Sequence, residues 1–151
     1  MQLRYRAFSV LAAVLLIAVS IVYLESTPSM AEPLSVTLTG AQEVPPVRTL
    51  ATAVSTITVA ADGTVTGVVD TMGISGTMAH IHQGAIGVSG PVVVTLEQTS
   101  AKRWSVPAGT KLTAAQLESY KSGELYVNVH SAAHKSGEIR LQLTPTAGVT
   151  R

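Results

Sequence analysis

The stretch GELYVNVHSAAHKSGEIRLQL, residues 123–143, decides the fold. Apolar and polar side chains alternate along Glu124–His130 and again along Glu138–Leu143, and a period of two is that of a β-strand. Between them, Ser131–Gly137 is a short and mostly polar segment that ends in glycine, which is typical of a loop. The stretch therefore predicts a strand, a loop and a return strand.

Five segments nearer the N-terminus show the same alternation or a run of β-branched residues. They predict strands at 34–40, 53–60, 64–70, 77–82 and 91–97. Asp62 and Gly63 stand between the second and the third of these segments, and an Asp-Gly pair is a strong signal for a hairpin turn. Seven short strands with turn signals between them are typical of an antiparallel β-sandwich or flattened barrel.

One short helix is predicted, over Thr113–Lys121. Thr113 and Gln116 have the spacing of a capping box, and Gly123 stands just past the expected end of the helix. Residues 102–111, which precede the helix, are predicted to be irregular. The predicted fold class is therefore all-β, with about seven strands and one short helix.

The first 31 residues have the three parts of a secretory signal. Two arginines precede an uncharged run from Ala7 to Tyr23, and Ser29-Met30-Ala31 forms a cleavage site with small residues at both ends. Cleavage there leaves one domain, residues 32–151. The alternative is an uncleaved anchor, because 17 uncharged residues approach the roughly 20 that span a bilayer as a helix. With either outcome we expect an exported domain that meets a membrane only through residues 1–31.

The charge balance argues against nucleic acid as a partner. Two of the ten basic and one of the nine acidic side chains lie in residues 1–31, so eight of each remain. A net charge of zero without a basic stripe offers no electrostatic footprint for a polyanion. The remaining 120 residues are enough for one packed core, and the absence of cysteine means that no thiolate is available to a metal.

All four histidines lie in two short segments of the chain. His80 and His82 share one face of the strand predicted at 77–82, because side chains at i and i+2 point the same way. The apolar residues predicted to face the core are Ala79, Ile81, Leu125, Val127 and Val129. His130 therefore also points away from the core. If the two strands are neighbours, these three histidines meet on one outer surface, within reach of His134 from the loop.

This arrangement predicts a metal site. Two imidazoles on one strand face stand about 7 Å apart and can share an ion when their rings lean together. His130 and His134 supply the third and fourth nitrogens, and imidazole suits both copper and zinc. Gln83, Asn128 and Glu138 are the predicted partners that would fix the imidazole tautomers. The alternative interpretation is that the histidines are structural and bond to backbone groups near turns.

Three segments carry distinctive motifs: LTGAQEVPPV (38–47), AHIHQGAIGVSGPVVVTL (79–96) and LTAAQLESYKSGELYVNVHSAAHKSGEIRLQL (112–143). Together and in this order they resemble the CHRD domain, a module named for its occurrence in chordin and also found alone in exported bacterial proteins. The resemblance implies a fold and a location more than an activity. The chain departs from the family pattern at Leu141, where glycine is usual, and at His134, which is an additional histidine.

A looser resemblance concerns the site alone. The HIH pair is similar to the copper-binding H-x-H of copper–zinc superoxide dismutase, which also lies on the outer face of an antiparallel barrel. This chain lacks that enzyme's long zinc-binding loop and its disulfide. The resemblance therefore implies copper at His80 and His82 and does not extend to dismutase activity.

The leading hypothesis is an exported domain that binds a transition metal, copper before zinc, through His80, His82, His130 and His134. Its role is binding or storage rather than turnover. The first alternative is a protein-interaction module with structural histidines, in which the surface around Val44–Val47 contacts a protein partner. The second alternative is a metalloenzyme with an open coordination position.

Overall fold

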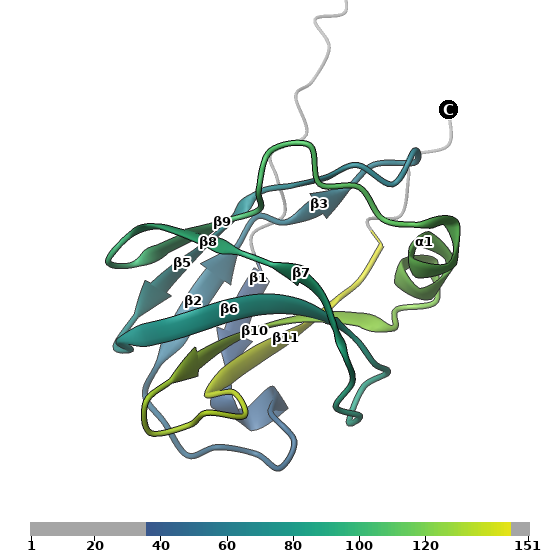
Figure 1. The fold of residues 1–151 in the computed structure, drawn as a ribbon. Coiled ribbons are helices and arrows are strands. Elements are labelled where there is room, and N and C mark those ends of the chain that lie inside the picture. Colours follow the sequence, from purple (N-terminus) through teal and green to yellow (C-terminus); the bar gives the residue numbers. More distant parts are fainter. Residues whose placement is uncertain (1–35, 146–151) are drawn as a thin grey trace, which may run out of the picture. The chain divides into compact units, whose positions relative to one another are not determined.

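A computed structural model of the chain describes residues 36–145 (Figure 1). The predicted signal, residues 1–31, lies outside the described residues. The strands are β1 Val36–Thr39, β2 Thr52–Ser55, β3 Thr58–Val59, β4 Val65–Thr66, β5 Val68–Met72, β6 Gly76–Gln83, β7 Val92–Thr95, β8 Glu97–Ser100, β9 Arg103–Ser105, β10 Leu125–Ser131 and β11 Ile139–Leu143. The helices are the 3-10 helix η1 Gly40–Gln42 and the α-helix α1 Ala114–Lys121. Within residues 36–145, no helix is both long and apolar enough to cross a membrane.

Nine of the strands form one sheet of antiparallel neighbours, in the order β7-β6-β10-β11-β1-β2-β5-β9-β8. The two end strands, β7 and β8, are separated in the chain by Leu96 alone, and the Leu96 N–H donates to the Ala79 carbonyl of β6. The sheet therefore curls until its ends come together (Figure 1). Strands β3 and β4 pair separately. The predicted all-β fold, an antiparallel sandwich or flattened barrel with one short helix, is confirmed.

The strands are more numerous and shorter than predicted. The segment predicted at 53–60 forms β2 and β3, and the segment predicted at 64–70 forms β4 and β5. Gly67, between β4 and β5, has a φ of 124°, and a Cβ at this position would lie 2.5 Å from the Thr56 carbonyl oxygen. Only glycine tolerates this close approach and this backbone conformation. The bend at Gly67 divides its segment in two, and the segment facing it divides at Thr56.

The prediction of irregular structure over 102–111 is wrong in part. Residues Arg103–Ser105 form β9, which pairs with β5 and β8. Arg103 donates to both carboxylate oxygens of Asp70 on β5, at 2.7 and 2.8 Å. Trp104 is buried in the core. Three residues are too few to show an alternating pattern, and this strand is defined by its partners.

One hydrophobic core fills the inside of the curled sheet. The five residues predicted to face the core from β6 and β10 are each at most 1% exposed. Their prediction is therefore confirmed, and with it the register of both strands. β10 is buried along its whole length, because the opposite face of this strand is covered as well.

Helix α1 has the predicted cap. The Thr113 hydroxyl accepts from the Gln116 N–H at 3.3 Å, and the Gln116 side-chain oxygen accepts from the Thr113 N–H at 2.9 Å. Gly123, just past the end of the helix, has a φ of 72°. The capping box and the glycine therefore mark both ends of the helix, as predicted.

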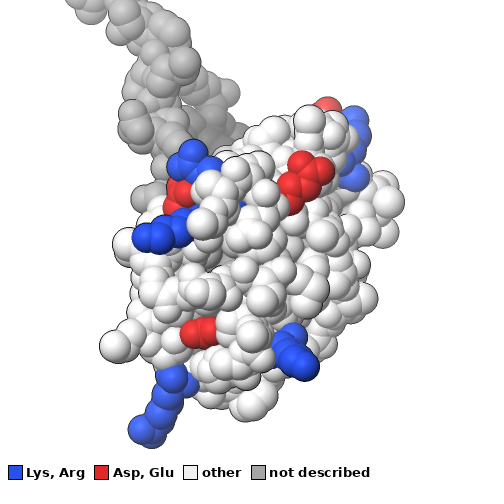
Figure 2. Space-filling view, turned by 60° about the vertical axis from the view of Figure 1, so that its left-hand side comes forward, with Lys and Arg blue, Asp and Glu red and all other residues white. Residues whose placement is uncertain are grey.

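Ion pairs in the described part of the chain are few and exposed. They are Arg103–Asp70, Lys111–Asp62 and Lys121–Glu118. Figure 2 shows one face of the molecule, on which charged side chains of both signs are scattered and most of the surface is uncharged. No large patch of one sign appears on that face.

Candidate metal centre

His80, His82 and His130 lie on two neighbouring strands. β6 and β10 pair antiparallel, with Asn128 opposite His80 and Tyr126 opposite His82. The adjacency on which the predicted cluster depends is therefore present. All three imidazoles lie on the side of the sheet away from the core, because the alternate residues of both strands fill the core.

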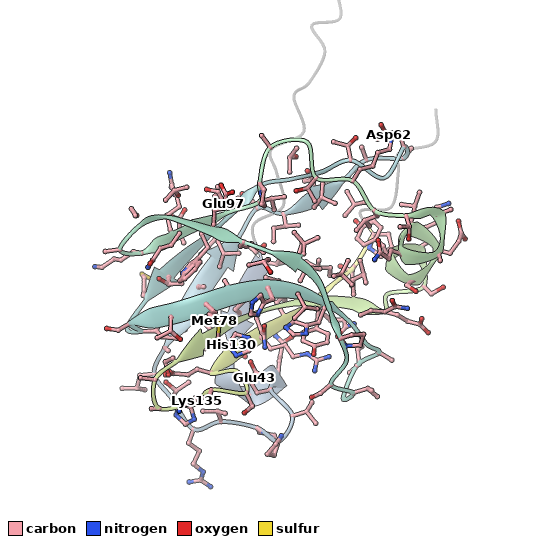
Figure 3. The ribbon with its side chains drawn as sticks, viewed as in Figure 1. Glu43, Asp62, Met78, Glu97, His130 and Lys135 are labelled. Carbon is pink, nitrogen blue, oxygen red and sulfur yellow. The ribbon has the colours of Figure 1, made fainter. Side chains whose placement is uncertain are left out.

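The cluster lies under loops rather than on an open surface, which corrects the prediction of a surface cluster. His82 is 8% exposed and His130 is 6% exposed. The segment between β6 and β7 reaches His82 through the Gly90 carbonyl, and the segment between β10 and β11 reaches His130 through the Lys135 carbonyl. Figure 3 shows the labelled His130 on the same side of the ribbon as Glu43 and Lys135. Alternation predicts the face of a strand but not the loops that fold over it.

The three imidazoles form a compact triangle. Ring centroids are separated by 5.4 Å between His80 and His82, by 5.0 Å between His80 and His130, and by 6.1 Å between His82 and His130. One nitrogen from each ring lies within 4.8 Å of the other two. Two nitrogens bound to one tetrahedral ion at about 2.05 Å stand about 3.3 Å apart. The rings therefore need to converge by roughly 1.5 Å at most to hold one transition-metal ion.

Backbone carbonyls fix two of the tautomers. His82 Nδ1 lies 2.9 Å from the Gly90 oxygen, and His130 Nδ1 lies 2.9 Å from the Lys135 oxygen. A carbonyl oxygen can only accept, so in each ring Nδ1 carries the proton and Nε2 keeps its lone pair. His130 Nε2 lies 3.0 Å from His80 Nδ1, and His82 Nε2 is buried without a hydrogen-bond partner among the described residues. Metal-binding histidines are usually oriented by such a bond at the other ring nitrogen.

Two of the histidines, His80 and His82, are held in the neutral form that a metal requires. Burial lowers the pKa of His80, and the neighbouring imidazoles of His130 and His82 lower it further. Burial also lowers the pKa of His82, against the opposing effect of its bond to the Gly90 carbonyl. At neutral pH both rings therefore offer a lone pair without first releasing a proton to solvent.

A stack of side chains holds the His82 ring in place. The Tyr126 ring lies parallel to it, with an interplanar angle of 4° and a centroid distance of 4.9 Å. The guanidinium carbon of Arg140, on β11, lies 3.4 Å from the Tyr126 ring centroid. The Tyr126 hydroxyl accepts from the Gly90 N–H at 3.1 Å, in the loop that also bonds to His82. Three strands and one loop therefore fix the orientation of one imidazole.

The other predicted residues are placed differently. His134 lies in the loop after β10 and is not one of the three converging histidines. Gln83 donates to a serine hydroxyl on α1 at 2.9 Å, and Glu138 accepts from a threonine hydroxyl at 2.7 Å. Asn128 alone borders the cluster, opposite His80, and its side-chain oxygen is buried without a hydrogen-bond partner in the described part of the chain.

Four groups that support the site were not predicted from the sequence: the Tyr126 ring, the Arg140 guanidinium, and the carbonyls of Gly90 and Lys135. The position of Tyr126 could have been predicted, because alternation places this residue on the same face of β10 as His130. No sequence signal marks the two carbonyls, since every residue has one and only the path of the loop selects it.

The fold and the site together define an antiparallel β domain with three clustered histidines beneath its loops. Residues 34–143 match the family model of the CHRD domain. The chain therefore belongs to the CHRD domain family. No curated protein and no solved structure matches the chain.

Proposed function

We propose that this protein binds one transition-metal ion through His80, His82 and His130, with copper favoured over zinc. The observation that carries the proposal is the convergence of three imidazole nitrogens within 4.8 Å, two of them with tautomers fixed by backbone carbonyls. The proposed role is binding or storage, in a domain exported by the signal in residues 1–31. The fourth coordination position is left to water or to a ligand from outside the three histidines.

The chemistry of the donors supports copper. All three donors are imidazoles, and the chain has no cysteine to supply a softer ligand. Sites of this type bind Cu(II) more tightly than the other divalent ions of the first transition series. Zinc has the same preference for imidazole and is the second choice.

The rival interpretation is a structural one. The 3.0 Å contact between His80 and His130 is itself a hydrogen bond when His80 carries a proton on Nδ1. In that case the cluster would link β6 to β10 without any ion. The two interpretations differ in whether His82 Nε2, which has no hydrogen-bond partner within residues 36–145, gains a metal ion as its partner.

The test is a titration of the chain, purified without a histidine tag, with Cu(II) and then with Zn(II), followed by calorimetry. We expect one ion per chain, a Kd for Cu(II) below micromolar, and weakening by at least a hundredfold in the His80→Ala/His82→Ala variant. Near-ultraviolet circular dichroism of the variant checks that it is folded. Wild-type protein that binds no Cu(II) tighter than micromolar would contradict the proposal.

His134→Ala is the matched control. It removes an imidazole from the same small region, but from outside the three converging rings. We expect the Kd for Cu(II) to change by less than threefold, and paramagnetic resonance of the Cu(II) form to report three coordinated nitrogens in both proteins. A tenfold loss in His134→Ala would show instead that the loop closes onto the ion as a fourth ligand.

A further inference from the structure

A cavity of about 460 Å³ lies beside the histidine cluster. Its walls come from η1 and the segment after it, from the loop 84–91, and from β11. This volume is within the range of small-molecule sites. Apolar side chains form part of its wall, among them Val44, Pro46 and Ile86. Arg140 and Glu43 also line it. The cavity thus combines apolar walls with two ionisable groups.

Arg140 brings a buried cation with unused hydrogen-bond donors to this cavity. The residue is only 2% exposed, and its Nη2 donates to the Ala85 carbonyl and to the Gln142 side-chain oxygen, each at 3.1 Å. Its Nε and Nη1 groups make no hydrogen bond to the described residues, and no carboxylate among them lies within ion-pair distance. A buried guanidinium with free N–H groups can form charge-assisted hydrogen bonds to an anion.

Glu43 forms no ion pair with that cation. It is 7% exposed, and its Oε1 is buried without a hydrogen-bond partner in the described part of the chain. Burial raises the pKa of this carboxyl to about 7, although the Arg140 charge acts in the opposite direction. The carboxyl therefore carries a proton for much of the time near neutral pH. In its protonated form it is a donor in the wall of the cavity.

Gln142, another polar residue of the wall, has its hydrogen-bond donors already in use. The Gln142 amide donates to the carbonyls of Gly84 and Gly123, at 2.8 and 2.7 Å, and its oxygen accepts from Arg140. Gln142 therefore positions the guanidinium and has no donor left for a ligand. The buried side-chain donors left unused in the cavity wall belong to Arg140 and to protonated Glu43, and the exposed Gln42 amide is a further donor at its edge.

We propose that this cavity binds a small carboxylate with an apolar body. The ligand carboxylate accepts from Arg140 and from protonated Glu43, and its hydrocarbon part lies against Val44, Pro46 and Ile86. The site is distinct from the metal centre, because it shares none of the three histidines. The Tyr126 ring connects the two sites, because Arg140 of the cavity lies against it and His82 of the metal centre stacks on it.

The test uses calorimetric titration of the metal-free chain with hexanoate and with hexanamide, which has the same body without the charge. We expect hexanoate to bind at least tenfold more tightly than hexanamide. Equal affinities, or no hexanoate binding at millimolar concentration, would overturn the proposal. Because the metal is absent, this outcome does not depend on whether the histidines bind copper.

Two loop variants locate the binding. Ile86 lines the cavity and is 81% exposed, so Ile86→Asp adds a negative charge at the mouth without disturbing the core. Val88 is 52% exposed in the same loop and is outside the cavity wall, so Val88→Asp is the matched control. We expect the Kd for hexanoate to rise at least fivefold in the first variant and to stay within twofold in the second. Equal effects of the two substitutions would place the anion elsewhere.

Discussion

Glu43 makes the stability of the protein depend on pH in an unusual direction for an acidic residue. Its pKa is raised by burial from 4.5 to about 7. Between these values the folded chain keeps a proton that the unfolded chain has released, so stability falls as pH rises. We expect the free energy of unfolding of the wild type, relative to Glu43→Gln, to fall by at most about 3 kcal/mol between pH 4.5 and 7.5. Urea denaturation of both proteins across this range measures the difference.

The comparison with Glu43→Gln isolates one group. His80 and His82 have lowered pKa values, so their protonation destabilises the fold as pH falls below about 6.5. That effect is common to both proteins and cancels in the difference. A difference that is flat, or that rises with pH, would show that the carboxyl is ionised in the folded state throughout.

Single residues of the site were predictable to different degrees. His80, His82 and His130 could be grouped from the sequence, because a period of two fixes which side of a strand each one occupies. Their tautomers could not be predicted, since these depend on the carbonyls of Gly90 and Lys135 in the covering loops. His134 lies only four residues after His130, and nothing in the sequence indicates that it is outside the group. Its position also depends on the path of the loop.

Among the elements, β10 contributes most to both core and site. It lies between β6 and β11, and every residue along it is buried. Leu125, at its start, is 0% exposed, so Leu125→Ala leaves a cavity and we expect a loss of about 3 kcal/mol in the free energy of unfolding. Leu50→Ala, at a leucine that is 98% exposed, is the control and should stay within about 0.5 kcal/mol of the wild type. Chemical denaturation of the two variants tests this, and similar losses in both would contradict the assignment of the core.

Elements with local signals were predicted well, and elements defined by partners were not. The hairpin of β10 and β11 carries its alternation in the sequence, and α1 carries its cap in Thr113 and Gln116. β9 was missed, because its place depends on pairing with β5, on the Arg103–Asp70 ion pair and on burial of one tryptophan. The divided strands around Gly67 were missed, because a close approach of two segments leaves no periodic pattern.

At the scale of the described fold, the curl of the sheet explains why both proposed sites lie side by side. β6, β10 and β11 are consecutive in the sheet although β6 is distant from the other two in the chain. Their outer face receives the loops 84–91 and 132–137 and the segment after η1, and these bury Arg140, Glu43 and the histidines together. A binding face enclosed in this way depends on the strand order, which alternation alone does not provide.

Metal binding should therefore stabilise the whole domain, since the ligands come from two strands that only the fold brings together. At a free Cu(II) concentration a hundred times the Kd, the stabilisation is about 2.7 kcal/mol when the unfolded chain does not bind the ion, which corresponds to a rise in Tm of roughly 10 °C. We expect this shift in the wild type and in His134→Ala, and no shift in His80→Ala/His82→Ala, by scanning calorimetry. A rise that persists in the double variant would place the ion at another site. Binding without any rise would mean that the unfolded chain holds copper equally well, and the three imidazoles would then not be a site made by the fold.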